Sequence, residues 1–507
     1  MEKKKKIRSA LLSVYHKDGL DPVLKQLVQN QVRLISTGGT AEYIRSKGYE
    51  VTTVESLTGY PGMLGGRVKT LHPKIFGGIL GRREVETDRE DFTRFEIPEI
   101  DLVVVDLYPF EQTVGEGGSH DEIIEKIDIG GITLIRAAAK NYRDVLVVSS
   151  MNQYPALLEL LENGEGATSL LQREQFAKQA FAVSSAYDTA IYRYFTPELD
   201  EGFRNSTGPA HILRYGENPH QKGLFFGDFN ALFDQLHGKE ISYNNLLDVD
   251  AAVRLADEFT EPMVAVLKHN NACGLALRNS VLEAWKDALA GDPVSAFGGI
   301  IITNRRLDEA TALEINKIFY EVVIAPEYDP LALEVLMQKK KRIILQRKTS
   351  RLPDEQFRSL LNGVLWQERD SRTEVPGDLK VVTKKAPDKR QVKDLLFANI
   401  LVKHTKSNAI VLAKNGQLLA SGAGQTSRID ALQQAIDKAT RFGFDLHGAV
   451  MASDAFFPFA DSVTIAHQAG VEAVIQPGGS IRDQESIDYC NEHNLIMVFS
   501  GIRHFKH

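Results

Sequence analysis

A lysine and a histidine stand side by side at the end of an apolar run, in the stretch PMVAVLKHNNACGLA at residues 262–276. The run 263–267 predicts a buried strand. Lys268 and His269 follow it, and small residues at 272–274 predict a turn. A histidine titrates near neutral pH and can take a proton from an attacking nucleophile. A lysine beside it can stabilise a developing oxyanion and keep the histidine neutral. The pair therefore indicates a catalytic base, with a histidine that bonds a backbone carbonyl as the alternative.

A second candidate site lies in STGGTAEYI, at residues 36–44, where a predicted strand gives way to a predicted helix. Gly38 and Gly39 permit a tight turn, and the helix N-terminus then presents free N–H groups that suit a phosphate. Thr37 and Thr40 add hydroxyl donors. The motif alone is equally consistent with an ordinary glycine turn that a threonine caps.

The stretch MLGGRVKTLHPKIFGGIL, at residues 63–80, carries basic and hydroxyl side chains between two glycine pairs: Arg67, Lys69, Thr70, His72 and Lys74. This composition favours an anionic ligand over the alternative of a solvated basic loop. Further along, DLYPF places Tyr108 at the end of a predicted strand, and DIGGITLIRAAAKN supplies Asp128 and Lys140. Asp128 can also cap the helix that follows it. The four motifs are expected at the strand ends of one sheet. Together they favour a pocket for a phosphorylated metabolite.

Polar clusters also occur in the C-terminal part of the chain, in HILRYGENPHQ, DPVSAFGGI, KHTKSNAI, GAGQTSR, SDAFFPFADS and SGIRHFKH. They contribute the candidate residues Arg214, Tyr215, Phe297, Gly298, Asn408, Arg428, Phe456, Asp461 and Arg503. Three phenylalanines near one carboxylate suit a flat heterocycle with an amidine-like edge. An aromatic core cluster is the alternative.

These candidates need elements that bring them together. From residue 8 to about 150, continuous apolar runs alternate with helical patterns, which predicts a parallel sheet covered on both faces. Such sheets bind ligands outside the carboxyl ends of their strands. Residues 151–200 predict helices, and the polar stretch TPELDEGFRNSTGP predicts a domain boundary after about residue 200. From residue 210 onward strands and helices mix, with strands predicted at AVLKH, GGIIIT, EVVIAP, AIVLAK, AVMASD, AVIQP and LIMVFS. The charged stretch 366–391 is expected to divide this region into two lobes, and inspection finds no internal repeat.

Composition narrows the class of protein. The 507 residues are 43% hydrophobic and 25% charged, as in soluble globular proteins. The net charge of −7 argues against a non-specific nucleic-acid binder, and no apolar run is long enough to span a membrane. Two distant cysteines, Cys273 and Cys490, fit a reducing cytosol, and the lack of a C-x-x-C pair argues against structural zinc. The basic run at residues 3–6 is expected to be a solvated tail, not part of a signal peptide.

The motifs together resemble the bifunctional family of AICAR transformylase and IMP cyclohydrolase. STGGT, GGRVKTLHP, DLYPF, DIGGITLIRAAAKN, RYGENPHQ, LKHNNACG, DPVSAFGG, KHTKSNA, GAGQTSR, SDAFFPF, QPGGSIRD and GIRHF occur in the order of the family, over nearly the whole chain. The resemblance implies an α/β protein. Residues 1–200 would form a methylglyoxal-synthase-like parallel-sheet domain, the cyclohydrolase. Residues 201–507 would form the transformylase, two cytidine-deaminase-like lobes without zinc.

The resemblance also implies the reactions. A formyl group passes from 10-formyltetrahydrofolate to the 5-amino group of AICAR, and the product, FAICAR, cyclises to IMP with loss of water. For formyl transfer it implies His269 as the base, with Lys268 and Asn408 orienting and stabilising the tetrahedral intermediate. Asp461 is expected to bind the pterin-like ring of the folate. The residues expected to hold AICAR are Arg214, Tyr215, Asn245, Phe297, Gly298, Glu321, Arg428, Phe456 and Arg503.

For the first domain the resemblance implies a second set of residues. Cyclisation is assigned to Lys69, Tyr108, Asp128 and Lys140. The nucleotide, chiefly its phosphate, is expected to be held by Thr37, Gly38, Gly39, Thr40, Arg67 and Thr70.

The sequence departs from the family pattern at two positions: Ala272 stands where proline is common, and Glu321 where some members have aspartate. The expected setting is cytoplasmic, with small-molecule substrates, a homodimer with shared transformylase sites, and neither nucleic acid nor membrane as a partner. No catalytic metal is expected, and the binding of a monovalent cation stays open. Two other functions compete. A purine-nucleotide sensor would bind without turnover, and a deaminase-related hydrolase would need zinc ligands that the sequence lacks.

Overall fold

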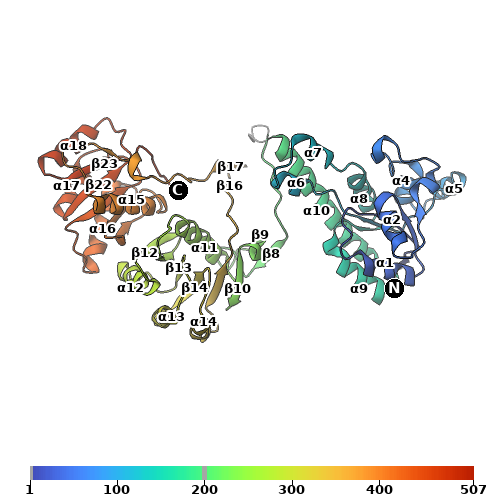
Figure 1. Ribbon diagram of the computed structural model, residues 1–507, viewed down its shortest axis with the longest axis horizontal. Coiled ribbons are helices and arrows are strands. Elements are labelled where there is room, and N and C mark those ends of the chain that lie inside the picture. Colours follow the sequence, from blue (N-terminus) through green and yellow to red (C-terminus); the bar gives the residue numbers. More distant parts are fainter. Residues whose placement is uncertain (1–3, 197–201) are drawn as a thin grey trace. The chain divides into compact units, whose positions relative to one another are not determined.

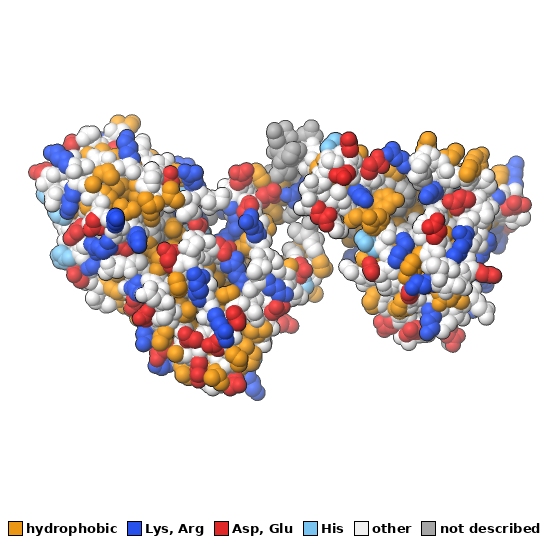
Figure 2. Space-filling view, viewed as in Figure 1, with side chains coloured by type: hydrophobic (Ala, Val, Ile, Leu, Met, Phe, Trp, Pro, Cys, Tyr) orange, Lys and Arg blue, Asp and Glu red, His pale blue; other side chains and the backbone are white. Residues whose placement is uncertain are grey.

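The computed structural model describes residues 4–196 and 202–507, and the chain forms two compact units, Met1–Thr207 and Gly208–His507 (Figure 1). The boundary predicted at residue 200 lies outside the described residues. Figure 2 shows acidic and basic side chains interspersed with exposed apolar ones on the visible face of each unit. Within the described ranges, no helix has the length and apolar character needed to cross a membrane.

A five-stranded parallel sheet forms the centre of the first unit. Its strands, in spatial order, are β4 (Thr52–Thr53), β3 (Arg33–Ser36), β2 (Ser9–Ser13), β5 (Leu102–Val105) and β6 (Leu146–Val148). Each neighbouring pair is parallel, which confirms the arrangement predicted from the continuous apolar runs. Because parallel strands end at the same edge of a sheet, the segments that follow β2, β3 and β5 meet at one edge.

Helices cover both faces of this sheet, because consecutive side chains of a strand point to opposite faces. Ala10 and Leu12 of β2 pack with helices α1 (Leu20–Gln29) and α9 (Tyr154–Asn163). Leu11 packs on the other face with α4 (Pro73–Leu80), α8 (Gly130–Lys140) and α10 (Leu170–Phe195). The remaining helical segments are α2 (Gly38–Ser46), α3 (Val54–Thr58), α5 (Glu86–Arg94), α6 (Phe110–Gly115), α7 (His120–Glu125), η1 (Leu64–Gly66) and η2 (Met151–Gln153).

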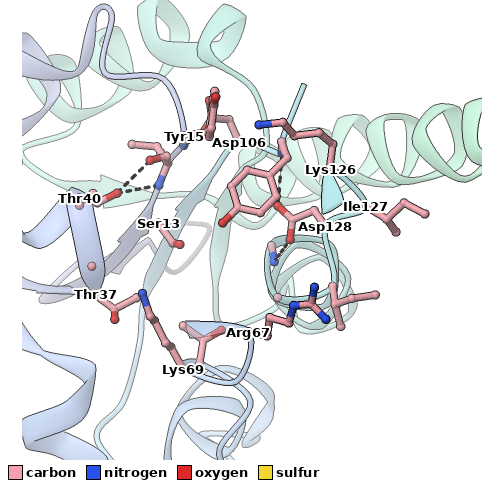
Figure 3. Close-up of a pocket in the computed structure, with 18 of the residues that line it drawn as sticks. Ser13, Tyr15, Thr37, Thr40, Arg67, Lys69, Asp106, Lys126, Ile127 and Asp128 are labelled. Atoms are coloured by element: carbon pink, nitrogen blue, oxygen red, sulfur yellow. Dashed lines mark hydrogen bonds between the residues drawn. The ribbon is translucent and has the colours of Figure 1, made fainter. Parts of the chain in front are cut away.

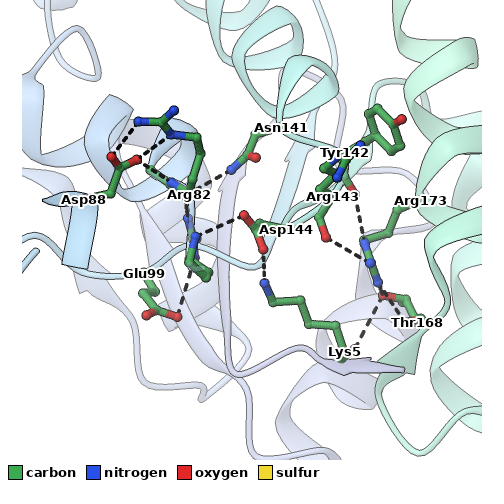
Figure 4. A network of polar contacts seen from close by, with 12 residues as sticks. Lys5, Arg82, Asp88, Glu99, Asn141, Tyr142, Arg143, Asp144, Thr168 and Arg173 are labelled. Atoms are coloured by element: carbon green, nitrogen blue, oxygen red, sulfur yellow. Dashed lines mark hydrogen bonds and ion pairs between the residues drawn. The ribbon is translucent and has the colours of Figure 1, made fainter. Parts of the chain in front are cut away.

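The basic N-terminus differs from its prediction. Lys5 and Lys6 form strand β1, which pairs with β7 (Ala167–Thr168), so the expected solvated tail is wrong for these two residues. Lys3 lies outside the described residues. The Lys5 ammonium pairs with the nearly buried carboxylate of Asp144 (Figure 4), and this charge pair fastens the segment to the start of β6. A run of lysines in a sequence does not reveal such a partner.

A buried arginine completes the same network. The Arg173 guanidinium, on α10, donates to the carbonyl oxygens of Tyr142 at 2.9 Å, Arg143 at 2.9 Å and Thr168 at 2.7 Å (Figure 4). Its donors therefore tie the end of α8 and strand β7 to α10, since hydrogen bonds from a charged group are among the stronger ones in proteins.

A twelve-stranded mixed sheet runs through the second unit. Its spatial order is β10 (Phe233–His237), β15 (Ile343–Arg347), β14 (Tyr320–Ala325), β13 (Gly299–Thr303), β11 (Met263–Lys268), β12 (Asn271–Leu277), β20 (Gln417–Gly422), β19 (Ile410–Lys414), β21 (Ala449–Ser453), β22 (Val471–Gln476), β23 (Ile496–Phe499) and β18 (Lys380–Val381). Two separate hairpins are β8–β9 (Ala210–Leu213, Gly223–Phe226) and β16–β17 (Glu355–Leu360, Gly363–Glu368). Short 3-10 turns are η3 (Phe229–Ala231) and η4 (Pro376–Asp378).

The sheet contains an internal repeat that inspection of the sequence misses. The order β12-β11-β13-β14-β15 of the first half recurs as β20-β19-β21-β22-β23 in the second, and each half begins with an antiparallel hairpin. In each half the third, fourth and fifth strands of this order are parallel to one another. The halves join where β12 meets β20, at the pair Ala276–Gln417.

Helices repeat with the strands. The first half has α11 (Tyr243–Ala256), α12 (Val281–Gly291), α13 (Glu309–Ile315) and α14 (Pro330–Met337). The second has α15 (Lys389–Lys403), α16 (Arg428–Arg441), α17 (Asp461–Gln468) and α18 (Asp483–Glu492). Side chains of α11 and α15 share one buried cluster, whereas α12 to α14 and α16 to α18 pack in two others. The first helices of both halves therefore cover one face of the sheet together.

Candidate active sites

A cavity of about 1030 Å³ opens where β2, β3 and β5 end in the first unit (Figure 3). The structure brings most of the predicted residues of this domain to its wall: Thr37, Gly38, Gly39, Thr40, Arg67, Lys69, Thr70, Tyr108 and Asp128. In Figure 3, Lys69 reaches toward Thr37, and Asp128 and Lys126 lie on the other side of the cavity. The separate sequence motifs therefore form one site.

The start of α2 forms an anion-binding corner of this cavity. Gly38 adopts a left-handed conformation, with φ of 54°, and opens the helix. A β-carbon on Gly38 would lie 3.1 Å from the Lys69 ammonium, so the positive charge sits directly beside the helix N-terminus. The Thr37 hydroxyl donates to Glu55 at 2.6 Å, and the Thr40 hydroxyl donates to the Val14 carbonyl at 2.9 Å. At this corner, backbone N–H groups and Lys69 are therefore suitable donors for a phosphate.

Asp128 and Tyr108 form the acid–base corner. The Asp128 carboxylate accepts the N–H of Gly131 at 2.6 Å, which confirms that it caps the start of α8, and the N–H of Tyr108 at 3.4 Å. Burial raises the pKa of Asp128, and these hydrogen bonds oppose it. Burial, with the charge of Asp128, also raises the pKa of the Tyr108 phenol. The carboxyl is thus a better proton acceptor than usual, and the phenol stays a donor at neutral pH.

A turn after β2 supplies lining residues that sequence reasoning missed. Asp106, which follows β5 directly, accepts a hydrogen bond from the N–H of Tyr15. It also accepts the N–H of His16 at 3.0 Å, and its carboxylate lies 2.8 Å from Nδ1 of the His16 ring. The Tyr15 ring meets Tyr108 edge-on at 5.4 Å, and the Lys126 ammonium lies 5.4 Å from the Tyr15 ring. The sequence did contain a signal for these residues. SVYHKDGL begins at the end of β2, just as the predicted phosphate motif STGGT begins at the end of β3.

Lys140 and Arg67 differ in placement. Arg67 lines the cavity and pairs with Glu125. Lys140 is the exposed last residue of α8, ten residues after Gly130, and is not among the residues that line the cavity. At about 1.5 Å per residue, this helix carries Lys140 roughly 15 Å from the end that faces the cavity. The structure of one chain does not bring Lys140 to the other predicted residues of this site.

The lysine–histidine pair of the second unit lies at a tight hairpin. Strand β11 confirms the predicted buried strand, but the predicted turn at 272–274 is wrong, because these residues belong to β12. His269 and Asn270 form the turn, with φ of 51° and 64°. Gly274 instead permits close packing, since a β-carbon there would overlap the carbonyl oxygen of Ala288 on α12. A small residue in a sequence is compatible with a turn or with close packing, and Gly274 serves close packing.

Contacts from this hairpin bring other motifs to it. Lys268 donates from Nζ to the Phe297 carbonyl at 2.7 Å. The Asn271 carboxamide accepts the N–H of Lys406 at 2.8 Å, which places the loop of Asn408 beside the hairpin. Asn408 donates from Nδ2 to the carbonyls of Gln425 and Thr426 at 3.1 and 3.2 Å. The predicted base, its lysine and the predicted asparagine therefore lie in one contact network.

Asp454 joins three further motifs. Its buried carboxylate accepts a guanidinium N–H of Arg428 at 3.2 Å and the N–H of Ala409 at 3.1 Å, and its carbonyl accepts the N–H of His504 at 3.0 Å. The Arg428 and Arg503 guanidinium groups lie 5.8 and 4.5 Å from the Phe505 ring. Two predicted cations thus face one aromatic ring near the C-terminus.

The remaining predicted residues of the second unit have local partners. Asn245 is buried and exchanges hydrogen bonds with Ser242 at the start of α11, and Glu321 pairs with Lys239 at 2.6 Å. The other contacts are those of Arg214 with Tyr215 (5.5 Å to the ring), Phe297 with Phe319 (5.3 Å between rings) and Asp461 with the N–H of Ser462 (2.7 Å). Gly298 has φ of 77°, and Phe456 is partly exposed.

A buried charge network also lies next to the hairpin and was missed, because its members sit in charged stretches typical of solvated surface. Burial alone would raise the pKa of Glu258, but hydrogen bonds from His404 at 2.9 Å and Lys403 lower it to about 2. Burial alone would lower the pKa of His504, but contacts with Asp370 and Glu374, at 2.6 and 2.9 Å, raise it to about 9. The network ties the C-terminal segment to the end of α15.

Among the residues that the structure describes, there is no group of three or more histidine, cysteine, aspartate or glutamate side chains placed to hold a metal ion.

Comparisons with known proteins cover both units. The family described as AICARFT/IMPCHase bienzyme matches residues 138–438, and the MGS-like domain family matches residues 19–133. Several relatives carry the name bifunctional purine biosynthesis protein PurH. The one from Bacteroides thetaiotaomicron is 63% identical over 507 residues, 100% of each chain. The relative from Aquifex aeolicus is 48% identical, and the match covers 98% of this chain and 100% of the relative. The relative from Rhodospirillum rubrum is 47% identical, and the match covers 99% of each chain.

Proposed function

The chain belongs to the AICARFT/IMPCHase bienzyme family, and we propose how its two units divide the two activities between them. It is a bifunctional enzyme of purine biosynthesis that acts on small molecules, with AICAR formyltransferase and IMP cyclohydrolase activity. It formylates AICAR from a folate-type donor to give FAICAR and cyclises FAICAR to IMP with loss of water. In the proposal the first unit cyclises, the second transfers the formyl group, and the donor is 10-formyltetrahydrofolate.

The cavity of the first unit carries the cyclohydrolase assignment, because it combines an anion-binding helix start with an acid–base corner. The nucleotide phosphate lies at the start of α2 beside Lys69. Asp128, whose pKa is raised, takes a proton from the carboxamide nitrogen of FAICAR as it attacks the formyl carbon. A C–N bond forms, and the formyl oxygen gains negative charge and takes one proton to become a hydroxyl. The C–O bond then breaks as this oxygen takes a second proton and leaves as water, while the 5-formamido nitrogen loses its proton and forms the C=N bond of the new ring. Tyr108, as a protonated phenol, donates to that oxygen.

The hairpin of the second unit carries the transformylase assignment. The 5-amino nitrogen of AICAR attacks the formyl carbon, and His269 takes the proton that the nitrogen loses. Lys268 and Asn408 stabilise the tetrahedral oxyanion, and both lie in the contact network of the hairpin. The bond from the formyl carbon to N10 of the folate then breaks, and N10 receives the proton. Arg428, Arg503 and Phe456 hold AICAR, and Asp461 holds the pterin ring.

A second copy of the chain completes the assembly in this proposal. The β16–β17 hairpin exposes apolar side chains: Leu361 is 98% exposed, Leu365 52% and Phe357 48%. A two-stranded sheet is marginally stable by itself, so a partner that covers these side chains stabilises it. We infer a homodimer that buries this hairpin. We also place the enzyme in the cytoplasm, which suits the two free, buried cysteines, Cys273 and Cys490.

Substitution of the proposed base separates the two activities. In His269→Ala the protein should lose formyl transfer, because the group proposed to take the amino proton is removed. It should still cyclise supplied FAICAR, since the cavity of the first unit is unchanged. Tetrahydrofolate release and IMP formation, measured separately by absorbance on one sample, check both statements. Full formyl transfer by His269→Ala would overturn the assignment of the base.

A further inference from the structure

The turn that carries His269 has a counterpart in the second half of the sheet. In both halves the first hairpin has a two-residue turn in which both residues are left-handed. In β19–β20 these are Asn415 and Gly416, with φ of 52° and 65°, the dipeptide that such turns favour. In β11–β12 the equivalent positions hold His269 and Asn270. A histidine is less suited to this conformation than asparagine or glycine, so its surroundings must hold it there.

An aspartate on the first helix of each half binds the turn. Asp394 of α15 accepts the N–H groups of Asn415 and Gly416 at 2.9 and 2.8 Å. Asp248 of α11 accepts the N–H of Asn270 at 2.6 Å. The same clamp therefore occurs twice, once at a favourable Asn-Gly turn and once at the turn with the proposed base.

The His269 turn has a further contact from the C-terminus. Lys506 donates from Nζ to the carbonyl of Asn270 at 3.4 Å and to that of His404 at 2.8 Å. Lys506 is itself fixed by Ser407: its N–H donates to the Ser407 hydroxyl at 3.0 Å, and its carbonyl accepts the Ser407 N–H at 2.9 Å. Burial lowers the pKa of Lys506 to about 8, in keeping with an ammonium enclosed between the turn and the loop of His404.

We propose that Asp248 and Lys506 are positioning residues of the formyl-transfer site, which hold the N–H and the carbonyl of Asn270 and so fix His269. The inference rests on the proposed role of His269 as the base. The His269 side chain is exposed and makes no hydrogen bond within the described part of the chain, and the Asp248 carboxylate interacts with it electrostatically. The backbone of the turn and Asp248 therefore set where the imidazole points. Lys268 differs, because its ammonium is anchored directly to Phe297.

Matched substitutions test the clamp. Asp248→Ala and Lys506→Met remove the two contacts, and Asp248→Asn keeps an acceptor oxygen without the charge. Asp394→Ala removes the equivalent clamp of the other half. Lys385→Met removes another half-buried lysine that donates to a carbonyl, that of Asn494 at 3.2 Å. Kinetics of formyl transfer, cyclisation of supplied FAICAR and thermal unfolding are measured for each variant.

Asp248→Ala and Lys506→Met should lower kcat for formyl transfer by about 10- to 100-fold, as displacement of a reacting group does, with KM for AICAR changed by less than about threefold. Asp248→Asn should recover most of kcat. The controls Asp394→Ala and Lys385→Met should keep the wild-type kcat. This should hold even where Asp394→Ala lowers the unfolding temperature as much as Asp248→Ala does. Cyclisation should be unchanged throughout. Losses of kcat no greater than those of the controls would overturn the clamp.

Double variants with His269→Ala, assayed at high enzyme concentration so that the residual formyl transfer of His269→Ala can be measured, separate positioning from general damage. If Asp248 and Lys506 act through His269, their substitution should not lower kcat for formyl transfer any further once the imidazole is absent. Undiminished losses in that background would overturn the clamp. The proposed base is judged separately: full activity of His269→Ala alone refutes the base, whereas an inactive His269→Ala with unaffected clamp variants refutes only the clamp.

Discussion

At the scale of single residues, burial separates the roles of the ionisable groups in the first unit. The nearly buried Asp128 is a stronger proton acceptor than an exposed carboxylate, and Tyr108 is held as a donor beside it. Lys69 stands apart from both, at the helix start where a phosphate would neutralise it. One cavity thus has the proposed base and the proposed anion-binding cation on different walls (Figure 3).

Asp128→Asn should therefore slow cyclisation of FAICAR by about 10²- to 10⁴-fold, the usual worth of a positioned general base. In the wild type, cyclisation should fall as the pH drops through the pKa of Asp128, which burial places above the ordinary value. A pH profile of IMP formation from supplied FAICAR measures this, with the exposed Asp21→Asn as control. Activity of Asp128→Asn within about threefold of the wild type would contradict the assignment.

His504 gives a pH-dependent contribution to stability. Its pKa is about 9 in the folded chain, against about 6.5 in an unfolded one, so protonation favours folding. The stabilisation is complete below about pH 6.5 and is lost as the pH rises through 9; its size is roughly 3 kcal/mol. His504→Gln should therefore flatten the pH dependence of the unfolding temperature between these values. A wild-type unfolding temperature that is constant over this range would refute the linkage.

At the scale of elements, the sequence predicted what continuous apolar runs encode. The strands β2, β3, β5 and β6 of the first unit, and β11, β13, β14, β19 and β21 to β23 of the second, carry such runs and were anticipated. The exposed strands β16 and β17 lack them and were missed. The turn at His269 was misplaced because backbone φ is not written in residue type, and Gly274 resembles a turn glycine. Lys140 was grouped with Asp128 by motif, which ignores the length of the helix between them.

The left-handed turn formed by His269 and Asn270 leads to a further prediction. Asn270→Gly should keep the hairpin and most formyl transfer, because glycine adopts positive φ without strain. Asn270→Val should destabilise the hairpin by about 1–2 kcal/mol, since a β-branched residue is disfavoured there, and should abolish transfer. Asn415→Val, at the equivalent turn of the second half, serves as control: it should cost similar stability and keep kcat. Thermal unfolding and steady-state kinetics measure both. Equal loss of kcat at the two turns would contradict a special role for the His269 turn.

At the scale of the whole molecule, the chain has two compact units with different sheets, and the proposal gives each unit one of two consecutive reactions. Under this proposal, substitutions at the site of one unit should leave the chemistry of the other intact. The internal repeat of the second unit adds a comparison inside the same molecule, because one half carries the proposed base and the other an ordinary turn.

Substitutions in the β16–β17 hairpin test the proposed homodimer. Leu361→Lys with Leu365→Lys should convert the proposed homodimer to monomers, because two charges would lie in an apolar interface. Formyl transfer should fall with the dimer if the transformylase sites are shared, whereas cyclisation of FAICAR should persist. Sedimentation velocity with both assays measures this, and Lys339→Glu with Lys341→Glu, on an exposed surface turn, is the control. A double variant with the unchanged sedimentation coefficient of a dimer would exclude this hairpin from the interface.

The most direct test of the account is a single assay on the purified wild-type protein with AICAR and 10-formyltetrahydrofolate. Tetrahydrofolate release and IMP formation are followed together by absorbance. The account predicts that both products form, in equal amounts at steady state, with no second enzyme added. Release of tetrahydrofolate without IMP would contradict the assignment of the first unit, and binding of AICAR without either product would contradict catalysis by the chain.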